Sequence, residues 1–143
     1  MTGVRAPLTH LFDANLQYED ALEPVVQLRD AGQLVGSGTG QVLGPRLQGT
    51  VRWSNFEQSE PDHCLLTLAG EIRTDDGAVI HFDSRGFALP ATASSWNVAS
   101  AVRLVVADAR YQWLQTAPAV WAGEFDAASG TARCRAYSAG DAL

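Results

Sequence analysis

Two stretches of alternating polar and apolar residues flank Thr74–Gly77, and together they predict a β-hairpin over residues 65–86. The Asp-Gly pair can form a two-residue turn. It also fits a type I turn with a left-handed glycine, which closes a three-residue loop with a bulge. A two-residue turn would place His81 beside Ile72 and mix polar with apolar side chains on both faces. We therefore predict the bulged turn, which sets Glu71 opposite His81.

This register divides the predicted hairpin into two faces of opposite character. The apolar face comprises Leu66, Leu68, Gly70, Ile72, Ala78, Ile80 and Phe82. The polar face comprises Glu71, Arg73, His81, Asp83 and Arg85. By pattern alone, such a polar face is typical of the solvated side of an antiparallel sheet. The alternative is a barrel lumen in which acid and base groups surround a ligand, with Glu71 and His81 as the first pair to test.

Composition and charge narrow the class of protein. The chain has 143 residues, of which 46% are hydrophobic and 18% charged, and these values predict one globular domain over residues 1–143, with flexible tails at 1–7 and 138–143. The net charge is −6 and the ten basic residues are all arginines scattered singly, which argues against a nucleic-acid partner. No stretch resembles a signal peptide or a membrane span, so we expect a cytoplasmic protein without a membrane partner.

Other parts of the chain predict further strands and their connections. A long strand is predicted over Leu8–Tyr18, with His10 on its apolar face as a core group rather than a ligand. The glycines of Gly36–Gly40 lack the Lys-Ser/Thr of a phosphate-binding loop, and strand bending explains them better. Residues 54–63 predict a polar connection, and residues 89–97 predict a long loop.

Two cysteines and a second hairpin complete the pattern. Cys64 and Cys134 lack the spacing of a metal site and are expected to be small buried side chains, with a disulfide as the minor alternative. Residues 120–125 and 131–137 predict a hairpin that places Glu124 among apolar neighbours, so its pKa is expected to be raised. Seven or eight strands with hardly a helical period predict an all-β fold, an antiparallel barrel or sandwich.

Four motifs follow one another along the chain: Gly44–Val51, Arg73–Ile80, Arg85–Gly86 and Tyr111–Leu114. In order and spacing they resemble a bacterial and fungal family of small β-barrel proteins known as domain of unknown function 3237. The likeness extends over most of the chain. It implies an antiparallel barrel of about eight strands, lipocalin-like or allene-oxide-cyclase-like, with an internal pocket and the capacity to form a homodimer.

The resemblance also implies roles for single residues. Arg73, Asp76 and Trp113 match the family motifs and carry over as framework or pocket residues. The chain departs from the family at Trp53–Glu57, where relatives tend to have Gly-Gly-x-Asp-Trp, and at Ala69–Glu71, where they often carry Arg-Tyr. Both changes could fall at a pocket wall, so the family's substrate does not carry over.

With this resemblance, the lumen interpretation of the polar face is favoured, and it predicts an enzyme. Its activity would be that of an isomerase, cyclase or lyase without cofactor, acting on a small apolar or polyketide-like molecule. Glu71 or Asp83 would be the base, and His81 its acid or base partner. Arg73 or Arg85 would bind charge that develops on an enolate oxygen. The predicted ligand-binding residues are Trp53, Arg85, Trp96, Trp121, Glu124, Trp113 and Asp76.

Three other functions stay open at this point. A binding protein of the same fold would hold a small organic ligand without chemistry, and Glu71→Gln would then leave its affinity nearly intact. A structural module would have no deep pocket. A metal-dependent variant would use Glu71, His81 and Asp83 as oxygen and nitrogen ligands.

Overall fold

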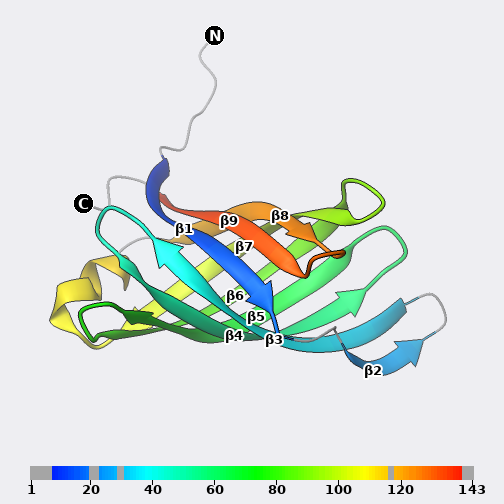
Figure 1. The fold of residues 1–143 in the computed structure, drawn as a ribbon, viewed down its shortest axis with the longest axis horizontal. Coiled ribbons are helices and arrows are strands. Elements are labelled where there is room, and N and C mark those ends of the chain that lie inside the picture. Colours follow the sequence, from blue (N-terminus) through cyan, green and yellow to red (C-terminus); the bar gives the residue numbers. More distant parts are fainter. Residues whose placement is uncertain (1–7, 20–22, 29–30, 116–117, 140–143) are drawn as a thin grey trace, which may run out of the picture.

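The computed structural model describes residues 8–19, 23–28, 31–115 and 118–139 (Figure 1). Within these residues lie strands and one short 3-10 helix, η1. Their bounds are β1 Leu8–Tyr18, β2 Glu23–Leu28, β3 Ala31–Leu43, β4 Gln48–Ser59, β5 Cys64–Thr74, β6 Val79–Pro90, β7 Ser95–Val106, η1 Ala109–Gln115, β8 Ala119–Asp126 and β9 Thr131–Ala139. The predicted all-β class is therefore confirmed.

Eight of the strands close into an antiparallel barrel in the order β1-β9-β8-β7-β6-β5-β4-β3. The barrel closes where β1 pairs with the second half of β3, from Asp13 opposite Leu43 to Tyr18 opposite Gly38. The first half of β3 pairs instead with β2, which lies outside the ring as an additional strand (Figure 1). Closure pairs each of these eight strands on both sides along at least part of its length, whereas among the described residues β2 pairs with β3 alone.

The β5–β6 hairpin has the predicted register. Glu71 lies opposite His81, and Arg73 lies opposite Val79. In the turn, the Gly77 amide donates to the carbonyl of Thr74 at 3.1 Å, and Gly77 has a φ of 94°, in the left-handed region that favours glycine. The turn chemistry therefore fixes which side chains of β5 and β6 share a face.

Thr74 holds this turn through its side chain. Its Oγ1 accepts a hydrogen bond from the Ala78 amide at 2.8 Å, and both residues are buried. Thr74→Val keeps the shape but leaves that amide unpaired, so we expect the free energy of unfolding to fall by about 1–3 kcal/mol. Urea denaturation would measure it. Asp75→Ala, on the exposed tip of the same turn, should stay within ~0.5 kcal/mol of wild type. An equal loss in both variants would contradict this role.

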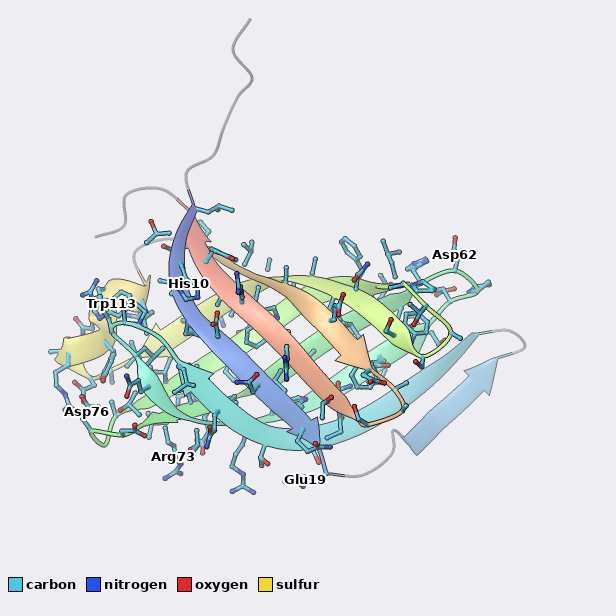
Figure 2. The ribbon with its side chains drawn as sticks, turned by 45° about the horizontal axis from the view of Figure 1, so that its top comes forward. His10, Glu19, Asp62, Arg73, Asp76 and Trp113 are labelled. Atoms are coloured by element: carbon cyan, nitrogen blue, oxygen red, sulfur yellow. The ribbon has the colours of Figure 1, made fainter. Side chains whose placement is uncertain are left out.

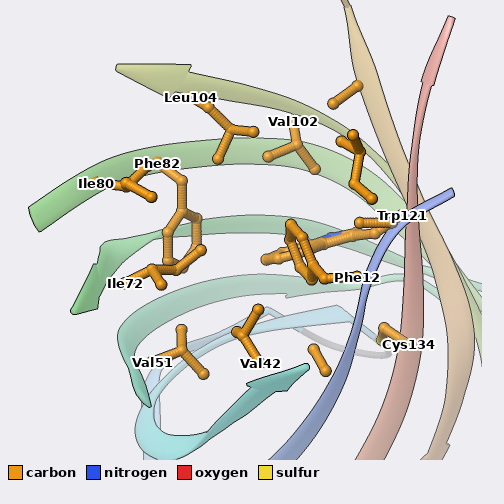
Figure 3. Close-up of a cluster of buried hydrophobic side chains, with 14 of the residues drawn as sticks. Phe12, Val42, Val51, Ile72, Ile80, Phe82, Val102, Leu104, Trp121 and Cys134 are labelled. Carbon is orange, nitrogen blue, oxygen red and sulfur yellow. The ribbon is translucent and has the colours of Figure 1, made fainter. Parts of the chain in front are cut away.

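The polar face of the hairpin points outward, so the predicted lumen orientation is wrong. Arg73, His81 and Arg85 are exposed, Glu71 and Asp83 are half-buried, and Arg73 projects away from the barrel (Figure 2). The inside is instead occupied by the apolar face of the hairpin, where Ile72, Ile80 and Phe82 are buried (Figure 3). The physical reason is that large apolar side chains fill the barrel at this level, while charged groups keep their hydration outside.

One end of the barrel is closed by η1, which buries Tyr111 and Leu114. The Tyr111 hydroxyl donates to Asp76 Oδ2 at 2.8 Å, and Arg110 Nη1 lies 3.3 Å from the same oxygen. The guanidinium of Arg46 stacks over Trp113, 3.8 Å from the ring centre. Asp76 thus connects the β5–β6 turn to η1, and Trp113 connects η1 to Arg46 in the β3–β4 turn.

Three local predictions differ from the structure. A bulge in β1 between His10 and Phe12 turns His10 outward, where its Nε2 lies 2.8 Å from Asp13 Oδ1, so it is not a core group. Residues 54–59 continue β4 instead of forming a connection, and the loop predicted at 89–97 shortens because β6 reaches Pro90 and β7 begins at Ser95. β9 extends to Ala139; residues 1–7 and 140–143 of the predicted tails lie outside the described residues.

Candidate active site

A cavity of about 230 Å³ occupies the half of the barrel that lies away from η1. Its lining residues are Leu16, Tyr18, Trp53, Glu57, Ser59, Cys64, Leu66, Leu68, Ala88, Trp96, Val98, Ser100, Trp121, Phe125, Ala127, Ala132 and Cys134. Ala127 is exposed, and Ser59 and Trp96 are half-buried, so the cavity reaches the surface at this end. Barrels of about eight strands can hold one small ligand in such an interior space.

The cavity exists because the inward side chains of the barrel change size along its axis. Toward η1 the interior is filled by large side chains such as Phe12, Ile80 and Phe82 (Figure 3). Toward the other end, inward positions carry small side chains, among them Ala88 on β6 and Ala132 on β9. A closed barrel of eight strands is just filled by its side chains, so small residues at one level leave a hollow there.

Aromatic rings form much of the cavity wall. Tyr18 makes edge contacts with Trp53 and with Phe125, at centroid distances of 5.3 and 5.2 Å. Trp53 lies against Gly38 of the paired strand, and a Cβ atom at Gly38 would come within 2.4 Å of the indole ring. Such rings give a ligand a large apolar contact area in a fixed geometry.

One carboxyl group, that of Glu57, lies in this wall. On β4 the inward positions are Val51, Trp53, Asn55 and Glu57, and all four are buried. The Trp53 indole N–H donates to Asn55 Oδ1, and Asn55 Nδ2 donates to Glu57 Oε1, each at 3.3 Å. The carboxyl group is thus held from one side by a neutral amide, and it is 8% exposed.

Burial raises the pKa of Glu57 from 4.5 to about 7. Burial also raises the pKa of Cys134 to about 11 and the pKa values of Cys64 and Tyr18, with the charge of Glu57 as a second cause for the last two. At neutral pH the thiols and the phenol therefore keep their protons, whereas Glu57 is divided between its acid and its base form. A carboxyl group in this state can both donate and accept a proton.

The structure separates the residues predicted for the site into three groups. Trp53, Trp96 and Trp121 line the cavity. Asp76 and Trp113 lie at the opposite end of the barrel, beside η1 (Figure 2). The remaining predicted residues, Glu71, Arg73, His81, Asp83, Arg85 and Glu124, lie on the outer wall.

The outer group does not share the interior cavity. Glu71 and His81 line a shallow polar depression on the outside of β3–β6, together with Arg52. The Glu71 carboxylate accepts a hydrogen bond from Arg73 Nε at 2.9 Å, and this bond lowers the pKa of Glu71. Asp83 lies 3.1 Å from Arg103 Nη2. Glu124, expected among apolar neighbours, is exposed. These groups are ion-paired or solvated.

Sequence reasoning missed Glu57, although a signal for it was present. The alternation of Val51 and Trp53 continues through Asn55 to Glu57 without a break. Because two polar residues occupy these positions, the sequence pattern indicates a polar connection there instead of a continued strand. They also lie in Trp53–Glu57, one of the two segments that differ from the resembled family; Trp53 and Glu57 line the cavity, whereas Ala69 and Glu71 of the other segment lie at the outer depression.

The described residues contain neither a cluster of metal ligands nor a helix that could span a membrane. Among the described residues, no three His, Cys, Asp or Glu side chains lie together as a metal site would require. None of the helical segments in the described part of the chain is long and apolar enough to cross a membrane. Cys64 and Cys134 are both buried and free.

Comparisons with known proteins support the fold. A protein of unknown function from Clostridium acetobutylicum aligns with a TM-score of 0.85 and 15% identity, over 97% of this chain and 100% of that chain. A β-barrel-like protein from Acinetobacter baumannii aligns with a TM-score of 0.83 and 14% identity, over 97% and 99%. An enzyme from Penicillium herquei aligns with a TM-score of 0.75 and 19% identity, over 98% of both chains.

Such low identities show a shared fold alone. No family model and no curated protein matches this sequence. Membership of the resembled family therefore stays a prediction, while the small antiparallel barrel itself is confirmed.

Proposed function

We propose that this barrel is a cofactor-independent enzyme that moves a proton within a small apolar molecule, as an isomerase, cyclase or lyase. The observation that carries the proposal is Glu57, a buried carboxyl group with a pKa of about 7 in the wall of an aromatic cavity. Catalytic acids and bases work best when their pKa lies near the operating pH, and burial is a common way to place it there.

The proposed chemistry uses Glu57 in both of its forms. As a carboxylate it takes a proton from a carbon or a hydroxyl group of the substrate. As the resulting acid it returns that proton to a different atom of the substrate, or to the group that leaves. Glu57 is a carboxylate again at the end of the cycle. The reaction consumes no proton and needs neither an oxidant nor a reductant. The surrounding rings exclude water, which strengthens the electrostatic interactions within the site.

The likeness to an enzyme from Penicillium herquei supports the proposal, since it shows that a barrel of this shape can carry catalysis. The alternative is a non-catalytic binding protein that holds the same kind of ligand. One observation favours it: of the described cavity residues, Glu57 alone has a pKa near neutrality, and the thiols beside it stay protonated. Turnover therefore has to separate the two functions.

Filling the cavity tests whether the interior is the site. Ala132→Phe on β9 would place a ring in the cavity, whereas Ala101→Phe would place the same ring on the exposed face of β7. In a thermal-shift screen of small ketones, phenols and hydrophobic acids, a ligand at 100 times its dissociation constant stabilises wild type by ~2.7 kcal/mol. We expect Ala132→Phe to lose that shift and Ala101→Phe to keep it.

A folded Ala132→Phe variant that still responds to the ligand would contradict the interior site. Circular dichroism establishes that the variant folds. If the ring at position 132 proves too large for the barrel, the smaller change Ala88→Leu on β6 fills part of the same cavity and provides the same comparison.

A further inference from the structure

A second polar group, Ser100, lines the same cavity as Glu57. Ser100 on β7 lines the cavity and is 5% exposed, and its Oγ has no hydrogen-bond partner in the structure. A buried hydroxyl without a partner is costly unless something pairs with it. Since Ser100 lies in a cavity wall, a bound molecule can supply the partner.

The register of the sheet connects the two groups through one row of paired residues. Glu57 pairs with Leu66, Leu66 with Gly86, and Gly86 with Ser100. Glu57 and Ser100 are thus three strands apart around an eight-stranded ring, close to opposite sides. Both groups line the same cavity, whose remaining lining is mostly apolar, so a molecule in the cavity can contact a polar group on each of these two strands.

Gly86 keeps the space beside the Ser100 hydroxyl open. A Cβ atom at position 86 would come within 2.3 Å of Ser100 Oγ. The glycine also lies at an inward position of β6, next to Ala88, so the wall of this strand has no bulky side chain at the level of the hydroxyl. The Ser100 hydroxyl is therefore not covered by a side chain from the neighbouring position on β6.

The described lining of the cavity carries no positively charged side chain. Among its described lining residues there is no arginine, lysine or histidine, and Glu57 is the one carboxyl group. The arginines and histidine of the β5–β6 hairpin all lie outside the barrel. A carboxylate ligand would therefore lose its hydration without gaining a counter-charge, and it would meet the like charge of Glu57.

We infer that the cavity selects uncharged molecules with an oxygen group at each end, one bound at Glu57 and the other, an acceptor oxygen such as a carbonyl, bound by the Ser100 hydroxyl, and that it rejects carboxylates. This inference rests on the proposed function, because it names the class of substrate for that site. Ser100 binds and positions the substrate, and Glu57 carries the proton.

A matched pair of probes tests the charge selection. The probes are para-hydroxyacetophenone and para-hydroxybenzoate, which have nearly the same shape but differ in charge at neutral pH. Calorimetric titration should show the ketone binding at least tenfold more tightly. In Glu57→Gln the preference should shrink, because one source of repulsion is removed. Equal affinity of the two probes for wild type would overturn the selection.

A second pair of variants tests Ser100. Ser84 on β6 is also buried and its Oγ also lacks a partner, but it does not line this cavity. We expect Ser100→Ala to weaken binding of the ketone about fivefold to tenfold, as the loss of one hydrogen bond predicts. Ser84→Ala should bind as wild type does. Equal binding by both variants and wild type would overturn the role of Ser100.

These outcomes are distinct from failure of the proposed function. If the ketone binds wild type and not Ala132→Phe, the interior binding site is supported. The two probes and the Ser100 variants then test only the rejection of carboxylates and the role of Ser100. If neither probe binds wild type, while the protein is folded, both the inference and the small-molecule site on which it rests are contradicted.

Discussion

Glu57→Gln is expected to lower turnover of any substrate of this barrel by about 10²–10⁴-fold, the usual contribution of a general acid or base. The amide has the shape of the carboxyl group and can still accept the hydrogen bond that Asn55 Nδ2 donates at 3.3 Å. It cannot take up or release a proton at neutral pH. Ligand affinity should therefore stay within a few-fold of wild type, and the loss should appear in kcat more than in KM.

The outer wall of the barrel supplies a matched control for this prediction. Glu71→Gln makes the same chemical change on the outer face of the neighbouring strand β5, where the Glu71 carboxylate pairs with Arg73. We expect it to keep full turnover. Loss of activity in Glu71→Gln with retention in Glu57→Gln would move the site to the outer depression. Ligand binding without turnover in the wild-type protein would establish the binding-protein alternative.

The same residue is expected to make the barrel less stable as pH rises. Glu57 ionises near pH 4.5 when the chain is unfolded and near pH 7 when it is folded. Between these values the folded state holds a proton that the unfolded state has lost, so the free energy of unfolding falls as pH increases. The difference between the two pKa values corresponds to roughly 3 kcal/mol, which is lost by about pH 7 and stays lost above it.

Glu57→Gln should remove this dependence, because a neutral amide replaces the group that titrates. Above neutral pH the variant should be more stable than wild type by up to ~3 kcal/mol. At mildly acidic pH the two proteins should be alike. Urea denaturation across the pH range measures the difference between them, and carboxylates elsewhere, such as Asp108 with its pKa lowered to about 2 by Arg110, cancel in that difference. Parallel pH profiles would show that Glu57 is not shielded from water.

A variant that is more stable and less active would also fit a general pattern. Catalytic groups are often held in surroundings that cost stability, and replacing them with neutral residues commonly stabilises the fold. Here the cost has a simple origin, since a group that must ionise during turnover is kept among aromatic rings.

Local patterns were enough to predict the hairpin and its register. The alternation of β5 and β6 and the glycine of the turn together determine that Glu71 faces His81, because both depend on residues close in sequence. The same applies to β1, predicted over Leu8–Tyr18 and observed with those bounds, and to the hairpin of β8 and β9. The number of strands and the absence of helical periods also predicted an all-β barrel or sandwich, without deciding between the two.

The inside and outside of that barrel were decided by the tertiary structure. A period of two assigns residues to two faces, but it does not say which face a closed sheet turns inward. The bulge that moves His10 outward shows how one extra residue changes the assignment. In the central hairpin, the face with Ile72, Ile80 and Phe82 points inward because these side chains pack in the barrel core. The charged face therefore lies on the outside, in contact with solvent.

By itself, then, the sequence determined the strands, their pairing within hairpins and the composition of each face, since these depend on neighbours along the chain. The tertiary structure alone determined the cavity and the group that titrates in it. The hollow depends on small side chains from separate strands, such as Ala88 and Ala132, meeting at one level of the barrel. The pKa of Glu57 is raised because those distant strands remove it from water, a property that no stretch of the chain contains on its own.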